Sequence, residues 1–341
     1  MVQLDGMVVQ LVEAKRFAEL PDPHHQRLAL LTLDNASEIS LRRSAHAVTS
    51  FAELYNNAKR VLTSSARPLG AEGQALLDDI ENETVSNTLS KRIDRDYVAL
   101  VDFVASRAPE SLADGHAQCL KIIHRFRNAA YHRDEIRPGV IGPAVKIMFF
   151  LCCHLLRNER SGIAHELGAV PPFTRQLLQA LVPDLEQRSH DSAVGLAQTV
   201  ADALLTDLEL DHAGINAALS AHLIGRLDQL ESDLDEIAAF GVPVTREVML
   251  RFVQQAPSTA EQLEAPLPDD FWTKPLPVSA STIDGWRSEA TTIADLRDAR
   301  QALTVFSEVD LALEALEAPV ERFVTDMDHE VQEAIDIARG K

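Results

Sequence analysis

The chain has 341 residues, more than one hydrophobic core usually organises, so two domains are expected. Hydrophobic residues make up 46% and charged residues 25%, with a mean hydropathy of -0.07, which excludes a disordered, collagen-like or membrane-embedded chain. The net charge of -20 is unevenly spread, because residues 1–160 carry 20 basic and 20 acidic side chains while residues 161–341 carry 12 and 32. The first half therefore remains available to a polyanion such as RNA.

Apolar residues recur at three- and four-residue spacing almost throughout the chain, which predicts an all-α protein. The first half is expected to hold five helical segments, separated by Pro and Gly turns. They cover about residues 8–20, 24–63, 74–107, 116–133 and 143–157. A break near Thr49 or Ser50 and a split of the third segment are left open. Residues 1–160 should form one helical bundle.

Residues 161–341 are expected to form a second, acidic helical domain. Breaks are predicted at residues 171–172, at Pro183 and at residues 241–243, where Pro and Gly occur. Residues 258–284 contain four prolines and several Ser and Thr residues, which predicts an irregular strap. Two long helices, about 283–316 and 320–338, should complete the chain.

The cysteines and the length of the apolar runs indicate the cellular compartment in which the protein is expected. Cys119, Cys152 and Cys153 lie in apolar segments and have no partner at zinc-ligand spacing, so reduced, buried thiols are expected. The N-terminus lacks the features of a signal peptide, and no apolar run approaches the roughly 20 residues that span a bilayer. We therefore expect a cytoplasmic protein with no membrane partner.

The segment at residues 116–133 carries the most informative polar residues. Its apolar stripe consists of Cys119, Ile122, Ile123, Phe126, Ala129 and Ala130. Arg127, Asn128, Tyr131 and His132 lie off that stripe. Arg127 and His132 are five residues apart, about 140° around the helix axis and about 7.5 Å along it, so they do not meet easily within one helix. A site that uses both residues requires either a frayed helix end near Pro138 or a second copy of the helix across a two-fold axis. The second arrangement predicts a homodimer.

Arg127, followed after four residues by His132 and directly by Asn128, resembles the R-x(4–6)-H motif of HEPN (higher eukaryote and prokaryote nucleotide-binding) domains. Those domains are bundles of four to five helices with the motif on the penultimate long helix, and the motif has that place here. Residues 30–38 resemble the acid-containing helix that packs against the motif helix. Glu38, Arg42 and Arg43 match a Glu-x3-(Lys/Arg)-Arg pattern of some toxin members.

The resemblance implies a metal-independent endoribonuclease of a defence or toxin type, without a cofactor. His132 would act as base or acid on the ribose 2′-OH, Arg127 would clamp the phosphate, and Asn128 would orient His132 or the substrate. The products implied are a 2′,3′-cyclic phosphate and a 5′-OH. Further residues implied to contact RNA or support the site are Glu38, Arg42, Arg43, Arg125, Tyr131 and Arg133.

Three interpretations remain open. In the first, the acidic second half restrains the ribonuclease or senses a trigger protein. In the second, the chain is a catalytically silent scaffold for dimerisation or RNA binding, and Arg127 and His132 are ordinary interhelical or solvated side chains. In the third, toxin and antidote share one chain, and the acidic half covers the basic residues around Arg127; a separate antitoxin is a further partner to consider.

Overall fold

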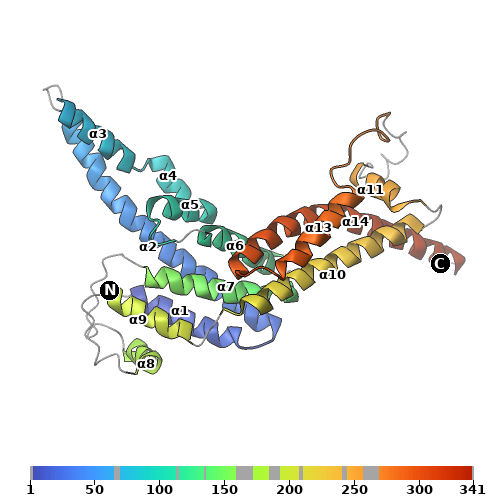
Figure 1. The fold of residues 1–341 in the computed structure, drawn as a ribbon, viewed down its shortest axis with the longest axis horizontal. Helices are drawn as coiled ribbons and strands as arrows, with labels where there is room; N and C mark the ends of the chain where they lie inside the picture. Colours follow the sequence, from blue (N-terminus) through green and yellow to red (C-terminus); the bar gives the residue numbers. More distant parts are fainter. Residues whose placement is uncertain are drawn as a thin grey trace. The chain divides into compact units, whose positions relative to one another are not determined.

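A computed structural model describes residues 3–64, 70–112, 115–133, 136–158, 172–183, 193–206, 210–239, 244–255 and 269–339. Within these ranges the protein has thirteen helices and no strand, so the all-α prediction is confirmed. The helices form two compact units, residues 1–210 and 211–341 (Figure 1).

Helix α2 organises unit 1. It begins where Asp22 accepts hydrogen bonds from the backbone N–H groups of His24 and His25, with Pro23 in the first turn, and it continues without a break at residues 49–50. Leu30, Leu33 and Leu41 of α2 are fully buried. The helices that pack on α2 (Pro23–Thr63) are α1 (Gln3–Ala18), α3 (Ala71–Glu83), α5 (Tyr97–Arg107), α6 (His116–His132) and α7 (Pro138–Arg157).

The segment predicted at residues 74–107 is three helices rather than one or two. Ser86 and Asp96 cap the starts of α4 (Asn87–Ile93) and α5, each by accepting a backbone hydrogen bond three residues on. Helix α3 runs back along the outer half of α2. The two form a hairpin that projects from the rest of unit 1 (Figure 1); residues 51–63 together with α3 are called the arm below.

Helix α7 is longer than predicted, because Pro138 occupies its first turn and Pro143 is accommodated inside it. It is the one helix in the described ranges that is long and apolar enough to cross a bilayer, and 67% of its apolar window is buried inside the bundle. That burial is typical of the core helix of a helical bundle. The preceding helix, α6, starts at Gly115, whose φ of 79° lies in the left-handed region.

The first compact unit extends beyond the boundary predicted near residue 160. Helices α8 (Pro172–Leu181) and α9 (Ala193–Thr206) follow that position, yet both pack on α1, and α9 also packs on α7. Val200, Ala201 and Leu204 of α9 are fully buried. The division between the compact units therefore falls between Leu210 and Asp211.

Unit 2 is built from α10 (His212–Ala239), α11 (Arg246–Gln255), α13 (Ala280–Ile293) and α14 (Ala299–Ala338). The break predicted before residue 320 is wrong: α14 runs through Pro319, and the chain turns instead at residues 294–298. The first part of the predicted strap, residues 258–268, lies outside the described ranges. Its last part is helical, because a capping box of Ser279 and Thr282 starts α13 at Ala280.

Candidate functional site

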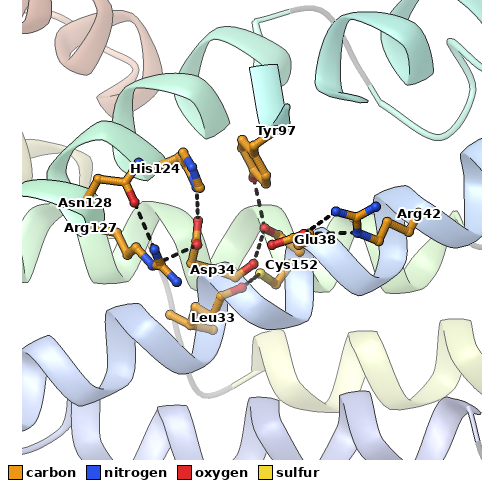
Figure 2. Close-up of polar contacts among 10 residues, drawn as sticks. Leu33, Asp34, Glu38, Arg42, Tyr97, His124, Arg127, Asn128 and Cys152 are labelled. Atoms are coloured by element: carbon orange, nitrogen blue, oxygen red, sulfur yellow. Dashed lines mark hydrogen bonds and ion pairs between the residues drawn. The ribbon is translucent and has the colours of Figure 1, made fainter. Parts of the chain in front are cut away.

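A buried carboxylate joins α2 to the motif helix α6. Asp34 is fully buried, and its Oδ1 atom lies 2.9 Å from Nδ1 of His124. Its Oδ2 atom lies 3.1 Å from Nε of Arg127, an ion pair without the alignment of a hydrogen bond. Figure 2 shows both α6 side chains turned toward this carboxylate. The ion pair with Asp34 holds the Arg127 side chain in place, and solvent can still reach the quarter of it that is exposed.

Asn128 and Tyr131 contact the guanidinium group of Arg127. Nη1 of Arg127 donates a 2.8 Å hydrogen bond to Oδ1 of Asn128, and the guanidinium carbon lies 5.3 Å from the centre of the Tyr131 ring. Among the described residues Nη2 has no partner within bonding distance. Asn128 was expected to orient His132 or the substrate, whereas its contact in the described chain is with Arg127.

His132 is the last residue of α6 and is exposed. Its ring meets the Tyr131 ring edge to face, with centres 4.9 Å apart, and it has no hydrogen-bond partner in the described ranges. Tyr131, itself 54% exposed, thus lies between the arginine and the histidine of the motif. Tyr131 and His132 are therefore exposed at the end of α6, next to the partly buried Arg127.

Tyr97 of α5 supports the cluster from the other side. Its ring stacks on His124 with centres 3.9 Å apart, and its hydroxyl lies 3.0 Å from Oγ of Ser37. Burial, with a contribution from the Asp34 carboxylate, raises the pKa of Tyr97 well above its usual value. Tyr97 therefore remains neutral and keeps His124 against Asp34.

Glu38 and Arg42 lie apart from this cluster. They pair with each other at 2.7 Å (Figure 2). Arg42 also donates to the backbone oxygen of Asp94 at 3.1 Å. Arg42 is eight residues beyond Asp34, which is about 12 Å along α2. Phe126 and Ala130 of α6 line a pocket together with Leu30, one turn before Asp34 on α2. The C-terminal end of α6 therefore points toward the start of α2. Arg42 and His132 consequently lie in opposite directions from Asp34.

The remaining predicted residues are distributed over both helices. Arg43 is half-buried on α2, the guanidinium of Arg125 lies 5.2 Å from the Phe126 ring centre, and Arg133 is exposed just after α6. Among the predicted residues, Arg127 contacts Asn128 and Tyr131, and Tyr131 contacts His132. Glu38 and Arg42 pair with each other.

The cysteines are buried thiols. Cys152 donates to the backbone oxygen of Leu33 at 3.3 Å, and burial raises the pKa of both Cys152 and Cys153 well above the usual value. Both thiols therefore stay protonated and unreactive. Across the described ranges, no three His, Cys, Asp or Glu side chains are grouped as a metal site requires.

Sequence reasoning assigned no role to Asp34. The signal was present, because Leu30, Leu33, Asp34, Ser37 and Leu41 fall on one helical stripe of α2. A carboxylate inside an apolar stripe requires a buried partner, since burial of an unpaired charge is costly. The partners, His124 and Arg127, are 90 or more positions away in the sequence.

Comparisons with known protein families, with curated proteins and with solved structures find no match to this chain. The resemblance to HEPN domains therefore rests on the motif residues and on the helices that carry them.

Proposed function

We propose that unit 1 is a metal-independent endoribonuclease of a defence or toxin type, with the phosphate-binding and proton-transfer groups at the end of α6. The observation that carries this proposal is the state of Arg127. Its Nε is paired with the buried Asp34, its Nη1 donates to Asn128, and its guanidinium carbon lies 5.3 Å from the Tyr131 ring centre, while a quarter of the side chain remains exposed to solvent. A guanidinium that is fixed in advance loses little entropy when it binds a phosphate.

The reaction uses these groups in one transfer. The His132 imidazole accepts the proton of a ribose 2′-OH, and the oxygen attacks the adjacent phosphorus. The bond from phosphorus to the 5′-oxygen breaks, and that oxygen takes up a proton from water. The fragments end in a 2′,3′-cyclic phosphate and a 5′-OH. Arg127 stabilises the negative charge that grows on the phosphate oxygens during the attack.

The test is cleavage of RNA with metals removed. Purified full-length protein incubated with total RNA in excess EDTA should give fragments whose 5′ ends polynucleotide kinase can label directly, and whose 3′ ends are cyclic phosphates. Mass spectrometry of a short oligonucleotide substrate identifies both ends. Cleavage that EDTA abolishes would exclude this mechanism. RNA left intact by both the full chain and the folded residue 1–210 fragment would favour the silent scaffold, in which the contacts of Asp34 with His124 and Arg127 are only structural.

We further propose that the acidic half restrains the ribonuclease until a trigger protein binds. Residues 211–341 carry 25 acidic and 10 basic side chains, so the net charge of unit 2 repels RNA. The same charge would attract any basic side chain that came within about 8 Å, the Debye length at physiological salt. The fragment that tests this should end at Leu210, because a cut near residue 160 would strip α8 and α9 from α1 and α7.

The residue 1–210 fragment is expected to cleave RNA at least about tenfold faster than the full chain at the same salt concentration. A tenfold change corresponds to about 1.4 kcal/mol, which we expect from removal of a charged surface that competes with RNA. Circular dichroism should first show that the fragment retains its helices. Equal or slower cleavage by the folded fragment would contradict restraint and assign unit 2 to another role.

A further inference from the structure

The arm carries an unusual share of the exposed apolar surface. Among the described residues, fifteen large hydrophobic side chains are exposed, and five of them belong to this one hairpin. These are Phe51, Leu54, Tyr55, Val61 and Leu76. Isolated exposed hydrophobics are ordinary on a protein surface, but a contiguous group marks an interaction site.

The α2 part of this group has the spacing of a helix-pairing seam. Phe51, Leu54, Ala58 and Val61 follow one another at intervals of three, four and three residues, so they share one face of α2. We call these four residues the arm stripe. Its three large side chains are 63%, 64% and 67% exposed. The inner seam of the hairpin is formed instead by Ala52 and Ile80, which are buried, so α3 does not cover the arm stripe.

The charges around the arm stripe indicate what covers it. Helix α3 has five acidic residues and no basic one, and residues 51–63 add one acidic residue and two basic ones, so the arm has a net negative charge that disfavours a nucleic acid as its occupant. On α2 the helical spacing places Ser50 and Asn57 beside the arm stripe, and both are uncharged and exposed. A second copy of the same helix can therefore approach without like-charge repulsion.

We propose that the arm stripe is a homodimer interface, in which α2 of one protomer packs antiparallel on α2 of its partner across a two-fold axis. Such an interface is self-complementary, since each protomer supplies the same four residues. Two hairpins joined in this way bury apolar residues of α2 that one hairpin leaves in water. The proposal does not depend on ribonuclease activity.

This location differs from the pairing of motif helices that the sequence predicted. Helix α6 presents one exposed large hydrophobic side chain, Tyr131, whereas the arm presents five. Burial of apolar area drives stable association, so the arm has more to gain from a second copy than the surface of α6 has.

The test compares the full-length protein with two charge insertions by sedimentation velocity at micromolar concentration. The wild-type chain of 37.5 kDa should sediment as a dimer. Leu54→Glu should sediment as a monomer, with dimer affinity at least about a hundredfold lower, because it places carboxylates at the centre of the interface. Val98→Glu is the matched control: Val98 is 42% exposed on α5, away from the arm stripe, and this variant should remain dimeric.

Circular dichroism establishes that each variant is folded, since both positions face solvent. A monomeric wild-type protein would overturn the proposal. A dimer that survives Leu54→Glu would also overturn it, and a dimer that dissociates on Tyr131→Glu but not on Leu54→Glu would assign the two-fold axis to α6. Equal dissociation by Leu54→Glu and Val98→Glu would show that the arm is not the specific contact.

Discussion

His132→Ala is expected to reduce RNA cleavage by about 10²- to 10⁴-fold, the range that loss of a general acid or base usually gives. The proposed reaction has no other described histidine at the exposed end of α6. The imidazole is exposed and has only a ring contact with Tyr131, so its removal should change the free energy of unfolding by less than about 0.5 kcal/mol. The measurement is the initial rate of cleavage of a labelled oligonucleotide, with circular dichroism as the check on folding.

His46→Ala provides the matched control for this variant. His46 is also an exposed histidine of unit 1, and its described side-chain contact is a 3.3 Å interaction with Oγ of Ser50 on the same helix. This variant should cleave at the wild-type rate. If His132→Ala cleaves as fast as His46→Ala, His132 takes no part in proton transfer and the assignment of the site to the end of α6 is wrong.

The long helices were predictable because they follow local rules. Periodic apolar residues and the Asp22-Pro23 start gave α2 its predicted limits to within a residue. The boundary between the compact units was not predictable in the same way. Helices α8 and α9 look like any amphipathic helix in the sequence, and only their packing on α1 and α7 assigns them to unit 1.

The turn between α13 and α14 shows why proline alone does not locate a break. Leu313, Leu316 and Val320 surround Pro319 on the buried face of α14, and their burial outweighs the lost backbone hydrogen bond. The actual turn at residues 294–298 depends on distant groups, since Asn216 donates to the backbone oxygen of Leu296 at 2.6 Å and His212 accepts from the N–H of Ala299 at 3.0 Å. Such tertiary contacts cannot be read from local sequence.

In the candidate site too, the residues on one helix were predictable and the contacts between helices were not. The motif predicted Arg127, Asn128, Tyr131 and His132, and in α6 Arg127 contacts Asn128 and Tyr131 while Tyr131 contacts His132. The Glu-x3-(Lys/Arg)-Arg match on α2 did not fall beside them, because helix geometry carries Arg42 away from Asp34. The residue that holds the arginine, Asp34, became evident only when α2 and α6 were seen in contact (Figure 2).

Asp34→Ala is expected to lower the free energy of unfolding of unit 1 by about 2 to 4 kcal/mol, because it leaves Arg127 and His124 without their shared buried carboxylate. This loss of unfolding free energy is smaller than the largest losses known for broken buried ion pairs, because a quarter of the Arg127 side chain is exposed to solvent. Asp34→Asn keeps the shape and can still bond His124, so it should cost about half as much. Urea unfolding followed by circular dichroism measures both changes.

Two internal comparisons make this prediction specific to the interaction. Both tryptophans of the chain, Trp272 and Trp286, belong to unit 2, so the urea transition followed by tryptophan fluorescence should not move in either variant. Arg127→Met in combination with Asp34→Ala should cost less than the sum of the two single changes by at least about 1 kcal/mol, because the first removes the charge that the second leaves unpaired. Additive losses would mean that Asp34 and Arg127 do not stabilise one another. In that case RNA cleavage by Asp34→Asn should equal that of the wild type. If Asp34 positions Arg127 for catalysis, the double-mutant cycle should show a coupling energy and Asp34→Asn should also cleave RNA more slowly.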